Sequence, residues 1–257
     1  MSSSTLATDL VQRLKQALTT KSDGLKTVLN DPSVEVLHAA LKNISLTEEH
    51  LLLLLKRQDL SSDILKAIDK HKLAQSHHVT VSIIRNSALP PGLTKQLMVK
   101  LRLFELLNLC ILPGQTSDIR VAAEHSICQR LASEPLGNKI SLAKRASSNL
   151  LLPLLKEGHP QIIEASLENP RLHESAIFQF LTSGATSAET ISIIARHPRW
   201  SKRKNLQRAI LKNHHTPQVW FIHFLPHLPT SEVRNLLHSS RLKTNQKKWI
   251  QDFLDTR

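Results

Sequence analysis

The chain has 257 residues, of which 40% are hydrophobic and only 4% aromatic, and it contains no Tyr and only 6 Gly. Because strands favour β-branched and aromatic residues and tight hairpins need Gly, this composition argues against an all-β fold. The 34 Lys and Arg against 21 Asp and Glu give a net charge of +13, which favours an acidic partner: nucleic acid, an anionic membrane surface or an acidic protein.

Residues 1–30 match the later pattern poorly, and we interpret them as an N-terminal capping segment, since terminal repeats are usually atypical. They lack the basic head and apolar run of a secretory signal. The longest pure apolar run, Leu51 to Leu55, is far shorter than the ~20 residues of a membrane span. We therefore expect a cytoplasmic protein without a membrane span. Cys110 and Cys128 are too few for a disulfide framework and too far apart for a metal knuckle.

From residue 31 onward the apolar residues indicate short helices at a spacing of about 14 residues. Two start signals support this interpretation. Ser45 with Glu48, and Thr186 with Glu189, resemble capping boxes, in which a hydroxyl and a carboxylate bind free N–H groups at a helix start. The segment therefore predicts a succession of helices with short connections.

Two stretches of the chain resemble each other. Residues 39–46 read AALKNISL and residues 165–172 read ASLENPRL, at an offset of 126 residues, and the similarity resumes after a slip of one residue. We interpret this as an internal duplication, with related units at about 31–156 and 157–257. Because no low-complexity linker separates the halves, we expect one continuous domain over 31–257.

A shorter period is marked by asparagines that end apolar stretches, as expected of helix C-termini. Asn43 and Asn86 are 43 residues apart, and Asn169 and Asn213 are 44 residues apart. A period near 43 lies in the range of HEAT and armadillo repeats. The sequence therefore predicts an all-α fold, a HEAT/armadillo-like superhelical solenoid of short helices with internal duplication.

The phrases ARHPRW at residues 195–200 and LENPRL at residues 167–172 carry a family resemblance. They resemble the bacterial leucine-rich repeat variant and related HEAT-like α-solenoids, which repeat an apolar helix, an Asn-Pro or His-Pro turn and another short helix. The resemblance implies a fold and a binding surface, and no particular reaction. Some members carry a cysteine cluster for an iron–sulfur centre, but this chain has no such cluster, so we expect no cofactor.

The most unusual segment is the basic window of residues 190–231, which contains no Asp or Glu. Its cations could contact phosphates. Trp200 and Trp220 could stack on bases, or they could be core residues that fill space between helices. The corresponding residues 74–79 of the first copy contain no Lys or Arg, so the fold does not need the cluster. A solvated helix face is the other interpretation. The predicted polyanion-binding residues are Arg196, Arg199, Lys202, Arg203, Lys204, Arg208 and Lys212.

Motifs of catalysis are missing from the sequence. It has no Gly-rich phosphate loop, nucleophile elbow, paired Cys motif or His-Glu-x-x-His arrangement, so we predict no catalytic residue and no metal site. HEAT-like DNA glycosylases remain one enzymatic alternative. Their carboxylate would have to come from Glu164, Glu168 or Glu174, brought across a cleft by the curvature of the solenoid.

The sequence thus predicts a non-enzymatic binding module whose basic surface contacts nucleic acid or another polyanion. The alternative is a scaffold that grips a protein partner in an exposed apolar groove of stacked helices. The sequence leaves the oligomeric state open. It also leaves open whether Phe178, Phe180, Phe221 and Phe224 are core residues or contact residues.

Overall fold

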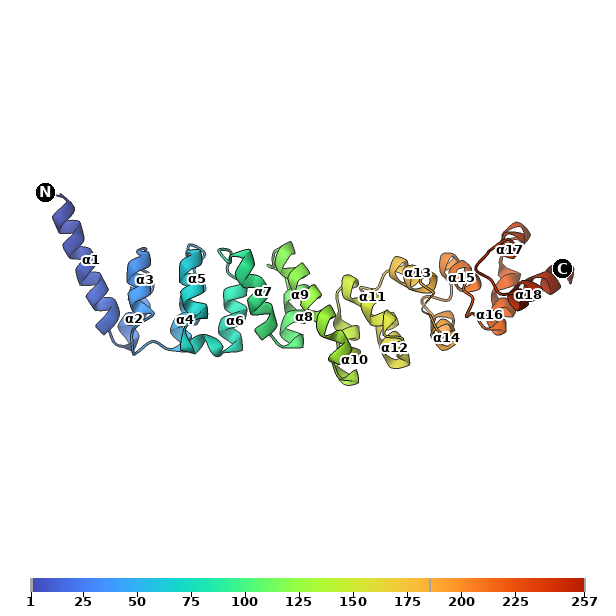
Figure 1. Ribbon diagram of the computed structural model, residues 1–257, viewed down its shortest axis with the longest axis horizontal. Helices are drawn as coiled ribbons and strands as arrows, with labels where there is room; N and C mark the ends of the chain where they lie inside the picture. Colours follow the sequence, from blue (N-terminus) through green and yellow to red (C-terminus); the bar gives the residue numbers. More distant parts are fainter. Residues whose placement is uncertain (1, 185, 257) are drawn as a thin grey trace. The chain divides into compact units, whose positions relative to one another are not determined.

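The computed structural model describes residues 2–184 and 186–256, with side chains from residue 8 onward. Every regular element in these ranges is a helix, and none of them is a strand (Figure 1). This confirms the predicted all-α class, whereas the solenoid arrangement stays a prediction. Across the described residues, no helix has both the length and the apolar character that crossing a membrane requires.

The chain divides into two compact units, which meet between Ile127 and Cys128. We call them unit 1 and unit 2. Their boundary falls inside helix α9 (Ser117–Arg130). The predicted duplicated units, about 31–156 and 157–257, are defined by sequence similarity and are not tested by this division. The internal duplication itself stays a prediction.

Unit 1 begins with the longest of its helices, α1, and continues with shorter ones. Its helices before α9 are α1 (Ser2–Thr19), α2 (Ser22–Val28), α3 (Val34–Ala40), α4 (Glu48–Leu54), α5 (Ser62–Asp69), the 3-10 helix η1 (Lys72–Gln75), α6 (His77–Ile84), α7 (Pro91–Lys100) and α8 (Leu103–Ile111). Residues 1–30, predicted as a capping segment, contribute α1 and α2, and α1 packs against α3 just as α3 packs against α5.

Unit 2 is built from short helices throughout. They are η2 (Leu131–Ser133), α10 (Leu136–Arg145), α11 (Ser148–Lys156), α12 (Pro160–Glu168), α13 (Glu174–Thr182), α14 (Ala188–Arg196), α15 (Lys204–Leu211), α16 (Gln218–Phe224), η3 (Leu225–His227), α17 (Thr230–Leu237) and α18 (Thr244–Asp255). Most are too short to be stable alone in water, so their stability comes from packing between helices.

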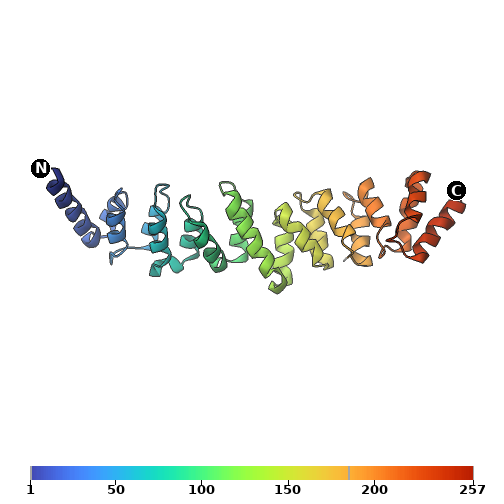
Figure 2. The same ribbon diagram turned by 45° about the horizontal axis from the view of Figure 1, so that its top comes forward.

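Within each unit a helix packs against the next helix but one. In unit 1, α2 contacts α4 and α4 contacts α6; in unit 2, α10 contacts α12 and α12 contacts α14, while α11, α13 and α15 form a second row (Figure 2). Helices two apart, such as α2, α4 and α6, begin 26 and 29 residues apart. Three α-helices, α4 to α6, and the 3-10 helix η1 lie between Asn43 and Asn86, so the predicted period near 43 spans more than one such helix pair. The repeat itself stays a prediction.

The four asparagines that suggested the period share one buried arrangement. Each side-chain oxygen accepts a hydrogen bond from the backbone N–H two residues later, and each side-chain NH₂ donates to carbonyls near the end of an earlier helix of the same row. The shortest of these donated bonds is 2.7–2.8 Å for Asn43, Asn86, Asn169 and Asn213. Because orphan carbonyls at a helix end need partners when buried, these amides join successive repeats.

The helix starts lie one or two residues from the predicted caps. The capping box of α4 is formed by Thr47 with His50, whose Nδ1 lies 2.7 Å from the threonine Oγ1, and not by Ser45 with Glu48. At α14 the cap is Ser187, which accepts a bond from the Thr190 N–H at 3.1 Å. Thr186 instead donates its hydroxyl to the Phe180 carbonyl.

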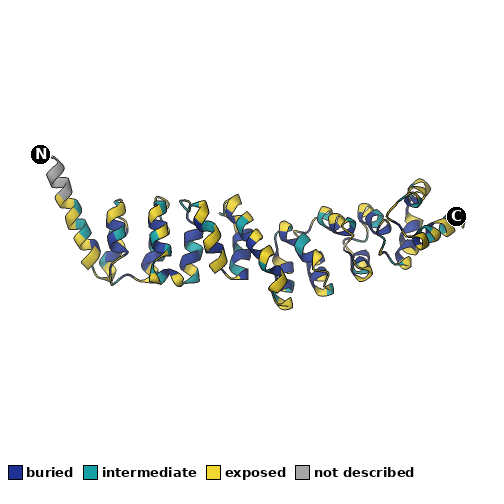
Figure 3. Cartoon of the chain, in the orientation of Figure 1, coloured by how far each residue is buried: buried dark blue, intermediate teal, exposed yellow. Residues whose placement is uncertain are grey.

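The core runs through each unit between the two rows of helices, and the outward faces are exposed (Figure 3). In unit 1 it is built mainly from Leu, Ile, Val and Ala. Unit 2 adds buried aromatic rings, namely Phe180, Trp200, Trp220, Phe221 and Phe224. The sequence left Phe180, Phe221 and Phe224 unassigned, and the structure places all three in the core.

Candidate polyanion-binding cleft

The basic window folds into parts of α14 and α17, the whole of α15 and α16, and their connections. Its seven predicted polyanion-binding residues do not all line one cleft. Two of them, Arg208 and Lys212, line one cleft of unit 2. The other five are exposed but do not line that cleft: Arg196, Arg199, Lys202, Arg203 and Lys204.

Two of these five residues, both of them arginines, bind backbone oxygens. The Nε of Arg196 donates to the Ser192 carbonyl at 3.1 Å within its own helix. Arg199 donates to the carbonyls of Asn169 and Leu172, each at 3.4 Å, just beyond the C-terminus of α12. Because a helix C-terminus carries a partial negative charge, a guanidinium there stabilises the fold. These two residues therefore have structural roles already.

Both tryptophans are core residues, the second of the two roles that the sequence allowed, and neither is placed to stack on a base. Trp200 is 2% exposed and Trp220 is 8% exposed. Each indole N–H is satisfied inside unit 2, by the Leu167 carbonyl and by the Ser192 hydroxyl, both at 3.0 Å. Trp220 also stacks on the buried Phe224 at 5.7 Å between ring centroids. Stacking on a base needs an open ring face, which neither residue offers.

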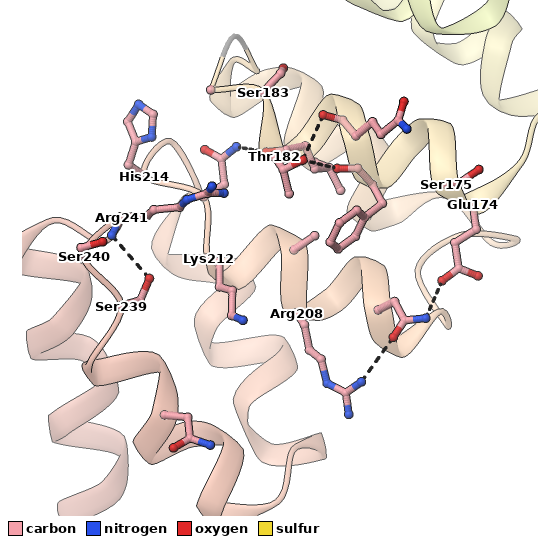
Figure 4. Close-up of a pocket in the computed structure, with 18 of the residues that line it drawn as sticks. Glu174, Ser175, Thr182, Ser183, Arg208, Lys212, His214, Ser239, Ser240 and Arg241 are labelled. Carbon is pink, nitrogen blue, oxygen red and sulfur yellow. Dashed lines mark hydrogen bonds between the residues drawn. The ribbon is translucent and has the colours of Figure 1, made fainter. Parts of the chain in front are cut away.

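The cleft has a volume of about 1330 Å³ and is lined by faces of α13, α15 and α17 with the connection to α18 (Figure 4). In Figure 4, Glu174 and Ser175 lie at one end of the cleft, and His214, Ser240 and Arg241 lie at the other. The basic side chains that line it are Arg208, Lys212 and Arg241, together with the histidines His214 and His238.

Two carboxylates from outside the acid-free window reach its cations. Glu232 of α17 accepts a bidentate pair of bonds from Arg208, with Nε–Oε2 and Nη2–Oε1 distances of 2.7 Å. The guanidinium holds the pKa of the Glu232 carboxyl below its ordinary value. Glu174 of α13 accepts a bond from the Asn205 amide at 3.2 Å and lies 3.9 Å from the Nε of Arg203. Arg208 therefore brings little free charge to the cleft.

Lys212 and Arg241 are the cations that remain available. Among the residues that the structure describes, no carboxylate lies within ion-pair distance of either side chain. Arg241 lies outside the basic window, and our sequence reasoning missed it. A signal was present, because Arg241 follows Lys212 by 29 residues, close to the length of one helix pair.

Phe178 is the exception among the phenylalanines that the sequence left unassigned. It is 43% exposed and lines the cleft, whereas Phe180, two residues later, is 1% exposed. An α-helix turns by about 100° per residue, so residues two apart point to different sides of α13. Phe180 is therefore buried in the core, and Phe178 lies on the face of α13 that lines the cleft.

The three glutamates considered for a glycosylase, of which one would suffice, line different hollows. Glu164 and Glu168 line a smaller hollow with Lys144, whereas Glu174 lines the large cleft. Over the part of the chain that the structure describes, no three His, Cys, Asp or Glu residues gather closely enough to hold a metal ion.

Comparison of the chain with protein-family models, with curated proteins and with solved structures finds no match. The case for a function therefore depends on the geometry of unit 2.

Proposed function

We propose that the chain is a non-enzymatic, HEAT-like α-solenoid whose unit 2 binds nucleic acid or another polyanion through the cleft between α13, α15 and α17. The observation that carries the proposal is the pair Lys212 and Arg241, two cations that line one cleft without a carboxylate partner among the described residues. A basic side chain that lies among other basic side chains and has no carboxylate to neutralise it attracts phosphates.

The distribution of charge supports the same location. Unit 2 carries 19 Lys and Arg against nine Asp and Glu, a net charge of +10. Unit 1 carries 15 against 12, a net charge of +3. Most of the excess that favours an acidic partner therefore belongs to the unit that holds the cleft.

The helical packing supports the solenoid part of the proposal. Both units pack helices in two rows with the same asparagine bridges between repeats. Stacked helix pairs of this kind commonly present their binding surface along one row of helices. Helices α13 and α15, which line the cleft, belong to one such row.

The test is the binding of fluorescent oligonucleotides to the full chain at about 50 mM and about 200 mM salt. Each phosphate contact contributes about −0.7 to the slope of log K against log salt on a single strand and about −0.9 on duplex DNA. We expect Lys212→Ala/Arg241→Ala to weaken binding by about ten- to hundredfold and to reduce the size of the slope by two contacts.

A matched control comes from unit 1. Lys42→Ala/Arg85→Ala also removes one Lys and one Arg, both exposed, but far from unit 2 in the sequence. We expect this variant to bind almost as the unaltered chain does. If both double variants lost the same affinity for the oligonucleotides, the assignment of binding to the cleft would be wrong. Absence of binding at low salt would contradict the proposed function.

One observation favours the alternative of a protein-binding scaffold. Helix α16 exposes Val219 and Ile222, which are 56% and 66% exposed. Exposed apolar side chains that share a helix face can contact an apolar protein segment. The same experiment separates the two proposals, because a scaffold that binds only such a segment would leave the oligonucleotides unbound at low salt.

A further inference from the structure

One face of α13 combines an open aromatic ring with polar groups. Glu174, Phe178 and Thr182 follow one another at intervals of four residues, and all three line the cleft. At this spacing side chains lie above one another on a helix. Phe178 is thus held on the cleft wall, with nearly half of its surface exposed to solvent.

The neighbouring wall of the same cleft supplies the cations. On α15 and its C-cap, Asn205, Arg208 and Lys212 line the cleft at spacings of three and four residues. Helices α13 and α15 are in direct contact, so the ring and these cations belong to adjacent elements. Arg241 completes the basic side from the connection after α17.

We infer that the cleft binds single-stranded nucleic acid, with Phe178 stacking on a base and with Lys212 and Arg241 contacting the phosphates on either side of it. This inference deepens the proposed function and rests on it. Proteins that hold single strands combine cations that follow the backbone with an aromatic face on which bases stack. Phe178 takes the role that the sequence analysis considered for Trp200 and Trp220.

The exposed ring distinguishes a single strand from a duplex. In a duplex the faces of the bases are covered by their neighbours, so an aromatic side chain in a cleft reaches a base only if the base is unstacked. Phosphate contacts alone would need no exposed ring. A duplex should therefore use the cations but gain nothing from Phe178.

The size of the cleft favours a strand over a single nucleotide. Small-molecule sites have volumes of roughly 300–1,000 Å³, and this cleft has about 1330 Å³. It is formed by three helices and a connection, and its polar lining includes Gln179 and Asn235, which can bind base edges. Because the bases would stack on one ring and make few such contacts, we expect the cleft to bind strands of different nucleotide sequence.

The experiment compares three probes of equal length on the full chain: a mixed-sequence single strand, a single strand with abasic sites throughout, and the duplex. We expect the mixed-sequence strand to bind most tightly. Phe178→Leu should weaken its binding by about 5- to 150-fold, the loss of one base–aromatic stack, and should leave the abasic strand and the duplex unchanged. Phe178→Trp should restore binding.

The control variant is Val219→Ala, which shortens an exposed apolar side chain of unit 2 outside the cleft. It should change none of the three affinities, and circular dichroism of every variant should match that of the unaltered chain. If Phe178→Leu binds the mixed-sequence strand as tightly as the unaltered chain does, the stacking role is wrong. If the duplex binds as tightly as the single strand, preference for a single strand is wrong.

These outcomes are distinguishable from failure of the proposed function. If Phe178→Leu binds normally while the abasic strand and the duplex lose affinity in Lys212→Ala/Arg241→Ala, the inference about Phe178 is wrong. The proposed polyanion-binding cleft would still stand. Absence of binding by all three probes at low salt would overturn both.

Discussion

The two units use the same contacts to build repeats and differ in what they do with charge. Arg57 in unit 1 donates to two carbonyls of an earlier connection, those of Leu29 and Asp31, and Arg199 in unit 2 donates to those of Asn169 and Leu172. Arg57 is neutralised by Asp59, whose Oδ2 lies 2.7 Å from its Nη2. Within the described ranges, no carboxylate forms such a pair with Arg199.

The comparison shows that this kind of helix packing forms without a large excess of positive charge. Unit 1 builds the same asparagine bridges with a net charge of +3, against +10 in unit 2. Uncompensated charge destabilises a compact state through self-repulsion. We interpret the excess in unit 2 as the feature that serves binding.

The largest expected effect on the free energy of unfolding is at Trp200, a position where the two units differ. The predicted duplication places it opposite Ala74 of unit 1, and both residues are buried. Although alanine suffices in unit 1, Trp200→Ala should lower the free energy of unfolding by about 3–5 kcal/mol, because the core of unit 2 would keep a cavity shaped by the indole. Urea denaturation measures this.

A second variant at Trp200 distinguishes the energetic cost of the cavity from the cost of the lost hydrogen bond. Trp200→Phe keeps most of the ring volume and loses the bond to the Leu167 carbonyl, so it should cost only about 1–3 kcal/mol. A loss under about 0.5 kcal/mol in Trp200→Ala, the range of ordinary surface substitutions, would contradict a core role for the indole.

The next largest effect on stability tests the buried asparagine side chains that both units share. Asn86→Ala in unit 1 and Asn169→Ala in unit 2 each remove a buried amide that bridges two repeats. Each should lower the free energy of unfolding by about 1–3 kcal/mol, because carbonyls at the end of an earlier helix are left unsatisfied. Asn30→Ala, at an exposed position, is the control and should have little effect. A large loss in one unit and none in the other would show that the bridges are not equivalent.

The smallest effect concerns pH. The pKa of Asp59 is lowered by Arg57, and that of Glu232 is lowered by Arg208. A carboxyl whose pKa falls on folding stabilises the protein above its unfolded pKa, and this contribution is lost as the pH falls through the folded pKa. Asp59→Asn and Glu232→Gln should therefore each flatten slightly the loss of stability on acidification.

Denaturation of the full chain between about pH 7 and about pH 3 measures this effect. It should be small and weaken further in high salt, since exposed ion pairs are screened. Identical pH profiles in the variants and the unaltered chain at low salt would show that these pairs contribute nothing to folding.

Local patterns in the sequence predicted the local structure well. The all-helical class and the end of α12 at its C-cap Asn169 follow from apolar spacing and from the chemistry of helix ends, both of which involve few neighbouring residues. Asn43 lies three residues after the last residue of α3. The spacing of the asparagines does not follow the helix pairs, because equivalent asparagines occur in both rows of helices and three α-helices lie between the two bridging asparagines of each unit.

The cleft depends on contacts between segments far apart in the sequence, and these were predicted poorly. Glu232 neutralises Arg208 from 24 residues away, and Arg241 joins Lys212 from the next helix pair. Composition of the window 190–231 could not show either contact. The burial of Trp200 depends on the Leu167 carbonyl, 33 residues earlier.

Hydrogen–deuterium exchange of the full chain with and without a bound single strand tests the central claim most directly. We predict added protection of the backbone amides in α13, in α15 and in the connection between α17 and α18, with unit 1 unchanged. Protection that appears in unit 1, or a bound strand that leaves these three segments unprotected, would contradict the assignment of binding to the cleft of unit 2.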